Sequence, residues 1–283
     1  LIKYDPLIFV CFTVILLSVI YLIWRLGNPP KEEPSLEGKH VLITGASSGI
    51  GKALAVEILA RSPSRMTLVA RNAKLLAETR DSLIQLHSNV NTDIEILSLD
   101  ITLPYDEIVK SLEANNVGVV DILINCAGTS VARTFEDTPP RVLEDMIRIN
   151  YMGAVNLTKA LLPDMLRPAL AVDKNGEGDK VIYPHERRIA FFSSPAAQLP
   201  IYGFSAYSAS KAALSAFANT IQQELEDDGI MVTVVYPPDT DTPGFCVSQN
   251  FPFLPIWLRT FLIRSADIRY DQQVFLLSVK GTC

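Results

Sequence analysis

The chain has 283 residues, a formal net charge of −6 and 48% hydrophobic residues. This length suffices for one sizeable α/β domain with appended segments, or for two smaller domains. The 25 Lys and Arg residues are scattered, which argues against a nucleic-acid partner, and the four Cys and three His residues lack the spacing of a disulfide framework or a metal site.

The N-terminal region contains an uncharged apolar stretch at residues 7–24. As a helix it would be about 27 Å long, close to the hydrocarbon thickness of a bilayer. A cleaved signal peptide and a buried core helix are the alternatives, but Tyr21, Trp24 and Arg25 close the stretch as a membrane interface does. We therefore expect residues 1–26 to form a membrane anchor. The basic residues after the stretch favour a cytosolic position for the rest of the chain.

The remainder of the chain predicts one α/β domain. Residues 27–37 are rich in Pro and charge and are expected to form a stiff linker. Short apolar segments then alternate with helix-length segments, a pattern typical of a Rossmann-type, doubly wound parallel sheet at residues 38–245. A polar surface insertion is expected at 171–187, and a substrate-side or membrane-contacting segment at 246–283. The predicted strands are residues 40–44, 66–70, 94–99, 120–124, 188–192 and 232–236.

A glycine-rich turn, TGASSGIG, connects the first predicted strand to a helix. Glycines allow the backbone to turn sharply and to approach a pyrophosphate closely, and the start of the helix offers unpaired N–H groups and a favourable dipole. A strand before the turn and a helix after it are the context that a dinucleotide site requires. The turn therefore predicts a nucleotide-cofactor site.

The TGxxxGxG spacing of this turn resembles the cofactor signature of the short-chain dehydrogenases/reductases. The resemblance covers about residues 38–245 and implies a nicotinamide cofactor and a hydride-transfer reaction. It implies that the cofactor is contacted by Gly45, Ser47, Ser48, Gly49, Ile50 and Gly51.

The second predicted strand ends in Val-Ala-Arg-Asn. In NAD-binding folds an acidic residue in this place usually binds the ribose 2′-hydroxyl. Arg71 can instead pair with a 2′-phosphate, and Lys74 can add a second positive charge. A solvated surface arginine is the alternative, but the lack of an acidic residue favours NADP(H). The resemblance adds cofactor contacts by Asp100, by Ile101, and by Asn125 in an Asn-Cys-Ala-Gly segment whose Cys replaces the family's second Asn.

Tyr207 and Lys211 lie four residues apart in Tyr-Ser-Ala-Ser-Lys, so on a helix they share one face. A tyrosine has a pKa of about 10 in water, too high for efficient proton exchange near neutral pH. A neighbouring ammonium group stabilises the phenolate and lowers that pKa. The pair is therefore predicted to exchange a proton with a substrate oxygen. The resemblance implies that both residues also contact the cofactor.

Two further positions match the same family. Ser194 ends a predicted strand 13 residues before Tyr207, where its hydroxyl can hold the substrate oxygen, and Ser193 is expected to line the substrate pocket. Asn150 matches the helix asparagine that maintains a relay water near the lysine. The resemblance thus implies a catalytic tetrad of Asn150, Ser194, Tyr207 and Lys211, with Ser193, Ser194 and Tyr207 contacting the substrate.

The segment at residues 236–245, YPPDTDTPGF, resembles that of the 3-ketodihydrosphingosine reductases. Pro237, Thr240 and Thr242 within it are expected to contact the cofactor. This resemblance implies NADPH-dependent reduction of the 3-keto group of 3-ketosphinganine, a long-chain membrane lipid. It also implies a place in the endoplasmic reticulum membrane with the catalytic domain on the cytosolic side, and it leaves a homo-oligomeric state open.

Two other functions stay open at this point. A membrane-anchored member of the same superfamily that acts on a steroid, a retinoid or another lipid would carry the same tetrad. A catalytically silent cofactor-binding scaffold is favoured only by the short segment at 246–283, because the family continues well beyond the YPPDTDTPGF loop. The complete tetrad argues against a silent protein.

Overall fold

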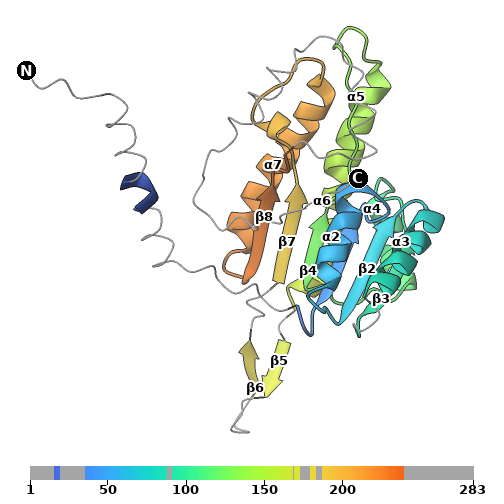
Figure 1. The fold of residues 1–283 in the computed structure, drawn as a ribbon, viewed down its shortest axis with the longest axis vertical. Coiled ribbons are helices and arrows are strands. Elements are labelled where there is room, and N and C mark those ends of the chain that lie inside the picture. Colours follow the sequence, from blue (N-terminus) through green and yellow to red (C-terminus); the bar gives the residue numbers. More distant parts are fainter. Residues whose placement is uncertain are drawn as a thin grey trace, which may run out of the picture. The chain divides into compact units, whose positions relative to one another are not determined.

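Six parallel strands form the centre of the computed structural model (Figure 1). The structure describes residues 16–19, 36–87, 91–167, 169–172, 179–182 and 187–238. The chain divides into two units, Leu1–Ser35 and Leu36–Cys283. The sheet belongs to the second unit.

Only a small part of the predicted anchor is described. Residues 16–19 are helical, and Leu16, Leu17 and Val19 are exposed. Within the described residues, none of the helices has both the length and the apolar character needed to cross a membrane. The rest of the anchor at 7–24, residues 27–35 of the linker and the segment at 246–283 lie outside the described residues, so these predictions stay predictions. Leu36, within the predicted linker, is buried in the core of the domain.

The sheet has the strand order β3-β2-β1-β4-β7-β8, and all five neighbouring pairs are parallel. The chain runs outward from β1 to β3 and then crosses back to β4 on the other side of β1. This reversal of direction is the switch point at which doubly wound sheets bind ligands. The predicted parallel sheet is confirmed. The strands are β1 (His40–Thr44), β2 (Arg65–Ala70), β3 (Asp93–Ser98), β4 (Ile122–Asn125), β7 (Arg187–Phe192) and β8 (Ile230–Val235).

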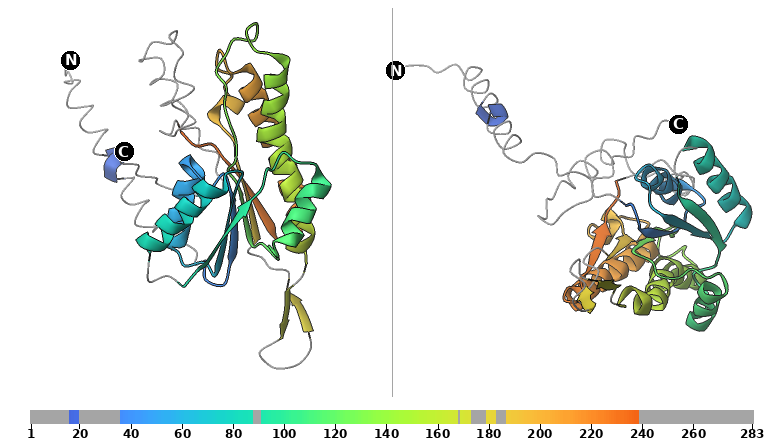
Figure 2. Two further views of the ribbon diagram at one scale, coloured as in Figure 1. Left: turned by 90° about the vertical axis from the view of Figure 1, so that its right-hand side faces the viewer. Right: turned by 90° about the horizontal axis from the view of Figure 1, so that it is seen from below.

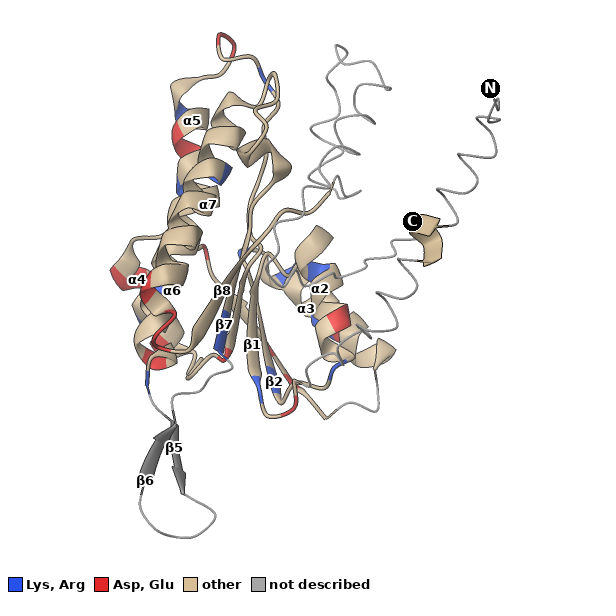
Figure 3. Ribbon diagram, turned by 90° about the vertical axis from the view of Figure 1, so that its left-hand side faces the viewer, with Lys and Arg blue, Asp and Glu red and all other residues tan. Residues whose placement is uncertain are grey.

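Helices cover both faces of the sheet (Figures 2 and 3). α2 and α3 pack on one face, and α4, α6 and α7 pack on the other. Lys and Arg residues are dispersed over several elements in the view of Figure 3. The helical elements are α2 (Gly49–Leu59), α3 (Ala73–Leu86), α4 (Tyr105–Ala114), α5 (Pro140–Ile147), the π-helix η1 (Arg148–Met152), α6 (Gly153–Met165), the 3-10 helix η2 (Pro195–Ala197) and α7 (Ser205–Leu225).

Alternation along the strands supplies a separate apolar core to each face. Leu42 and Ile43 are neighbours in β1 and fully buried, yet they belong to different clusters because successive strand side chains point to opposite faces. Phe191 of β7 joins Leu42 in the cluster under α4, α6 and α7. Burial on both faces explains why the strands read as nearly continuous apolar runs in the sequence.

His40 stabilises the amino end of the sheet. Its ring contacts the Thr67 hydroxyl at 2.8 Å and the Val119 carbonyl at 2.9 Å, and its backbone N–H donates to Asp121 at 2.8 Å. Burial lowers the pKa of His40, and the neutral ring suits these contacts. His40 is therefore a structural residue of the first strand.

A hairpin interrupts the chain between α6 and β7. β5 (Ala169–Val172) and β6 (Asp179–Ile182) pair antiparallel, with Ala169 opposite Ile182. The sequence predicted a polar surface insertion at 171–187. The structure adds that this segment contains the second half of β5 and all of β6, which form a sheet separate from the main one.

Candidate active site

The glycine-rich turn and the segment after β4 meet at the switch point. The Thr44 hydroxyl accepts hydrogen bonds from the backbone N–H groups of Cys126 and Ala127, each at 3.0 Å. A Cβ on Gly45 would lie 3.0 Å from the Ala127 Cα, so the two segments are almost in contact. One hydroxyl therefore holds together the ends of β1 and β4, where the cofactor site is predicted.

The turn itself has the geometry of a phosphate cradle. Gly45 and Gly49 adopt φ angles of +71° and +54°, which favour glycine. A Cβ on Gly51 would lie 2.4 Å from the Gly45 carbonyl oxygen, so the packing of α2 against the turn requires glycine at this position. Ser48 precedes α2 without a side-chain capping bond, which leaves the first N–H groups of the helix without that partner. The site therefore fits an anionic diphosphate group.

The positive charges predicted for a 2′-phosphate lie just past the end of β2. Arg71 and Lys74 are both exposed, and neither has an ion-pair partner within the described part of the chain. The Ser98 hydroxyl donates to the Arg71 carbonyl at 3.0 Å, and the Asn72 side chain accepts from the Leu75 N–H at 3.1 Å. The backbone of this segment is thus fixed while the two cationic groups face solvent. They can bind a phosphate.

Asp100 and Ile101 follow β3. The Asp100 carboxylate accepts from the backbone N–H and the hydroxyl of Thr102, at 2.9 and 2.8 Å. The Ile101 side chain is buried, and a Cβ on Gly153 would lie 2.8 Å from it. The Ile101 side chain therefore packs in the core, and its predicted cofactor contact stays a prediction.

Asn125 and Cys126 occupy the end of β4. The Asn125 amide donates to the Thr158 hydroxyl at 3.0 Å and so connects the strand to α6. Burial raises the pKa of the Cys126 thiol to about 12, although the Lys211 ammonium opposes this shift. The thiol is consequently neutral, and Cys126 forms no disulfide within the described residues. Thr240 and Thr242 lie outside the described residues, whereas Pro237 is half-buried shortly after β8.

Tyr207 and Lys211 both lie on α7, as predicted. The Lys211 Nζ atom is 6.0 Å from the centre of the Tyr207 ring. Lys211 is only 5% exposed, and its ammonium group donates to the Phe192 carbonyl at 2.7 Å. Burial lowers the pKa of Lys211 to about 8, with a smaller opposing effect from Cys126. Lys211 is therefore mostly protonated at pH 7 and close enough to act on the phenol.

Asn150 lies in the middle of η1, the wide turn between α5 and α6. Its side-chain oxygen accepts from the Thr129 N–H at 2.8 Å, and its side-chain nitrogen donates to the Thr129 carbonyl at 2.8 Å and to the Ser210 hydroxyl at 3.0 Å. The amide is thus fully engaged in holding the loop after β4 and the helix α7. Single π turns are frequent at functional sites. The Asn150 side chain therefore holds the site together, and its predicted role in maintaining a relay water stays a prediction.

Gly128 shows that Asn150 and Lys211 approach the same point. A Cβ on Gly128 would lie 3.0 Å from the Asn150 Oδ1 atom and 3.2 Å from the Lys211 Nζ atom. The fold therefore brings two tetrad members, one from η1 and one from α7, to the same glycine. Ser210 and Gly128 were not predicted as site residues, and Gly128 could have been found from the family's Asn-Asn-Ala-Gly pattern.

The two serines after β7 have different environments. The Ser194 side chain accepts from the Ala196 N–H at 3.2 Å at the start of η2, so its own O–H remains a donor. η2 packs against α7, the helix of Tyr207. Ser193 is buried, and its hydroxyl bonds to Ser215 at 2.7 Å and to the Lys211 carbonyl at 3.1 Å. These contacts give Ser193 a role in holding α7, and its predicted contact with substrate stays a prediction.

Comparisons with known proteins agree with this arrangement. The family model described as short chain dehydrogenase matches residues 39–249. The 3-dehydrosphinganine reductase of Danio rerio is 34% identical over 276 residues, which cover 97% of this chain and 76% of the relative. The 3-ketodihydrosphingosine reductase of Mus musculus is 37% identical over 230 residues, which cover 80% of this chain but only 63% of the relative.

A solved structure has the same fold. The crystal structure of L-sorbose reductase from Gluconobacter frateurii, complexed with NADPH and L-sorbose, matches with a TM-score of 0.60 and 28% sequence identity over 73% of this chain and 72% of that chain. The fold, the turn, the arrangement around Tyr207 and Lys211, and these similarities lead to one conclusion. The chain belongs to the short-chain dehydrogenase family.

Proposed function

We propose that this chain catalyses the NADPH-dependent reduction of 3-ketosphinganine to dihydrosphingosine. The observation that carries the proposal is that the Asn150 Oδ1 and Lys211 Nζ atoms both lie beside Gly128, with Lys211 Nζ 6.0 Å from the centre of the Tyr207 ring. Two similar proteins are named as reductases of this ketone, 3-dehydrosphinganine reductase and 3-ketodihydrosphingosine reductase. The YPPDTDTPGF segment resembles the same reductases.

The chain's own residues manage the proton in this reaction. The Tyr207 hydroxyl donates its proton to the ketone oxygen, and the Ser194 O–H holds that oxygen by a hydrogen bond. The Lys211 ammonium stabilises the phenolate that Tyr207 then carries. Asn150 holds the loop after β4 and the helix α7 in place around Lys211. Tyr207 then regains its proton from solvent by way of Lys211. The cofactor, when bound, supplies the hydride for the carbonyl carbon.

The choice of NADPH rests on Arg71 and Lys74. Both are exposed beside the end of β2, and a pair of cations there can bind a 2′-phosphate that NADH lacks. The turn from Gly45 to Gly51 would hold the diphosphate.

The membrane assignment is part of the same proposal. Residues 7–24 would anchor the chain in the endoplasmic reticulum membrane, with the catalytic domain in the cytosol. The uncharged apolar sequence of this stretch and the basic residues after it support this placement. An anchor also has a physical purpose, because a long-chain ketone partitions into the bilayer. A homo-oligomer is compatible with the proposal.

The test uses the membrane-bound full chain. It is incubated with 3-ketosphinganine and NADPH, and the formation of dihydrosphingosine is followed by mass spectrometry. Turnover is expected with this lipid, and no turnover together with efficient reduction of a steroid ketone would overturn the proposal. The matched control is Tyr207→Phe, which removes only the reacting hydroxyl. It should abolish turnover and keep the affinity for NADPH within about twofold, a change that corresponds to less than about 0.5 kcal/mol.

A further inference from the structure

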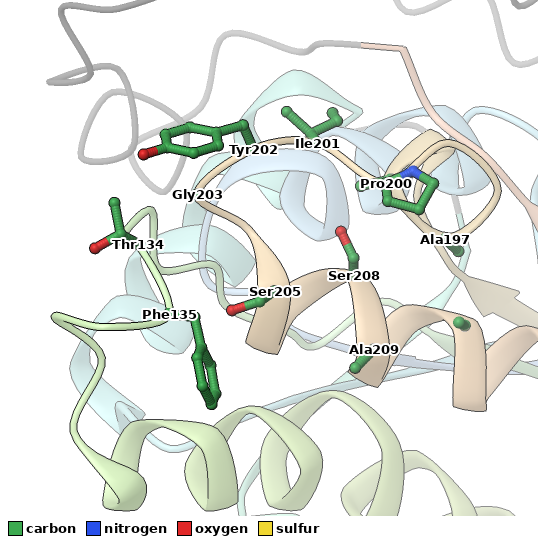
Figure 4. Close-up of a pocket in the computed structure, with 12 residues that line it drawn as sticks. Thr134, Phe135, Ala197, Pro200, Ile201, Tyr202, Gly203, Ser205, Ser208 and Ala209 are labelled. Carbon is green, nitrogen blue, oxygen red and sulfur yellow. The ribbon is translucent and has the colours of Figure 1, made fainter.

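The helix α7 has two sides with different surroundings. Ser205, Ser208 and Ala209 line a groove of about 570 Å³ together with residues from the loops after β4 and η2 (Figure 4). Tyr207 and Ser210 do not line this groove. Ser210 lies three residues after Tyr207, so the two share a side of the helix, and Ser210 is fully buried there, with 0% of its surface exposed. Ser210 therefore belongs to the side of α7 that carries the reacting phenol.

The Ser210 hydroxyl connects two members of the tetrad. It donates to the Tyr207 carbonyl at 2.7 Å and accepts from the Asn150 side-chain nitrogen at 3.0 Å. A serine hydroxyl has a single hydrogen, and here the Tyr207 carbonyl takes it. Ser210 can consequently only accept from Asn150, which must present its NH2 group to the serine.

This requirement fixes the direction in which the Asn150 amide points. The Thr129 N–H donates to the Asn150 side-chain oxygen at 2.8 Å. A Cβ on Gly128 would lie 3.0 Å from that oxygen and 3.2 Å from the Lys211 Nζ atom. A reversed amide would turn its NH2 group toward the Thr129 N–H and would point a donor at the region of the Lys211 ammonium. The orientation that Ser210 requires therefore places an acceptor oxygen on this side of the amide.

Asn150 has no equivalent second acceptor within the described part of the chain. Its side-chain nitrogen also donates to the Thr129 carbonyl at 2.8 Å, and the other contact is the Met146 sulfur at 3.9 Å, which is a weak acceptor. Asn150 is only 1% exposed. Without the Ser210 hydroxyl, one buried N–H group of this amide would lose its good partner, which is unfavourable.

We propose that Ser210 is a positioning residue for the reaction: its hydroxyl holds the Asn150 amide against the turn of α7 that carries Tyr207, and so fixes the place of Asn150 relative to Lys211. Ser210 acts through Asn150, so its effect on the rate depends on the Asn150 amide. The inference rests on the proposed reduction of a ketone with NADPH, but not on which ketone is the substrate.

The test measures kcat/KM for ketone reduction by the membrane-bound full chain with NADPH. Ser210→Ala should lower kcat/KM about tenfold, because Asn150 loses its bond to α7. Ser210→Thr keeps a hydroxyl that can bond to the preceding turn and accept from Asn150, so it should restore kcat/KM to within about threefold of the unmodified value. In an Asn150→Ala background, Ser210→Ala should lower kcat/KM by less than about twofold, because the two residues act as a pair.

Two control variants separate this role from other effects of mutation. Ser208→Ala is the same substitution on the same helix, but the Ser208 hydroxyl is buried without a hydrogen-bond partner among the described residues, so kcat/KM should stay within about twofold. Thr67→Val removes a buried hydroxyl that contacts the His40 ring at 2.8 Å, at the amino end of the sheet. It should lower the thermal midpoint and leave kcat/KM within about twofold.

Three results would each overturn the inference and leave the proposed function standing: a Ser210→Ala enzyme within twofold of the unmodified one, a Ser210→Thr enzyme as slow as Ser210→Ala, or the same loss from Ser210→Ala in both backgrounds. If Asn150→Ala shows no turnover, the comparison of the alanine and threonine variants decides. If the unmodified protein reduces a steroid ketone and not 3-ketosphinganine, the proposed function fails, and the same comparison made with the steroid still tests Ser210. A protein that reduces neither ketone would overturn both.

Discussion

Replacing Gly128 by alanine would place a methyl group between two members of the tetrad. The new Cβ would lie 3.0 Å from Asn150 Oδ1 and 3.2 Å from Lys211 Nζ, closer than ordinary van der Waals contact. Gly128 is not among the glycines with a positive φ angle, so alanine adds no backbone strain. The change therefore tests the placement of these two side chains without straining the backbone.

The magnitude follows from what holds the two side chains in place. Asn150 is fixed by hydrogen bonds to Thr129 and Ser210, and Lys211 by its bond to the Phe192 carbonyl. Displacing both by a few tenths of an ångström weakens two or three hydrogen bonds, each worth about 0.5–1.5 kcal/mol. A total of about 1–3 kcal/mol corresponds to a loss of about 5- to 150-fold in kcat/KM, because about 1.4 kcal/mol is a factor of ten.

The assay is the kcat/KM for ketone reduction, with the affinity for NADPH measured separately by fluorescence. Gly128→Ala should lower kcat/KM within that range, and because Lys211 is also expected to contact the cofactor, the separate measurement shows how much of the loss is in NADPH binding. Gly118→Ala is the control. Gly118 has a φ of +69° and lies near the Arg65 side chain at the amino end of β2, so alanine there should reduce stability only. A Gly128→Ala enzyme within twofold of the unmodified kcat/KM would refute the reasoning.

Three further outcomes follow from the site. Arg71→Asp should weaken NADPH binding by about tenfold or more and leave NADH nearly unchanged, and equal effects on the two would contradict the 2′-phosphate contact. Ketone reduction should decline as the pH rises through about 8, where Lys211 loses its proton, and a profile that stays flat from about pH 7 to 9.5 would contradict this role. Cys126 should resist alkylation by iodoacetamide at about pH 8 while the unfolded chain reacts, because its pKa of about 12 keeps it a thiol. Peptide mass mapping measures this, and rapid labelling of the folded protein would refute it.

The sequence predicted the sheet well because its strands are buried on both faces. β1 has the predicted bounds, and the other five strands differ from prediction only at their ends. The hairpin of β5 and β6 escaped prediction, since its strands are short and lie in a stretch rich in polar residues and glycine. The glycine-rich turn and the Tyr207–Lys211 pair were predictable because each depends on residues that are close in the sequence.

Contacts between segments that are far apart in the sequence could not be predicted from local motifs. The Asn150–Ser210 hydrogen bond joins residues 60 positions apart, and only the packing of η1 against α7 brings them together. The π turn itself has no local signal comparable to a glycine or proline. Motifs therefore predicted the site residues, whereas the hydrogen bonds that connect these residues could not be predicted from the sequence.

The extra residue in η1 determines where this chain can change in length. A π turn holds one residue more than an α turn, so deleting one residue there would restore a regular helix without turning the helix that follows. Leu157 and Leu161 of α6 would then stay in the core cluster, whereas Asn150, in the middle of the turn, would lose its place beside Thr129. The hairpin of β5 and β6 belongs to a separate two-stranded sheet, so residues can be added between its strands without altering the register of the main sheet.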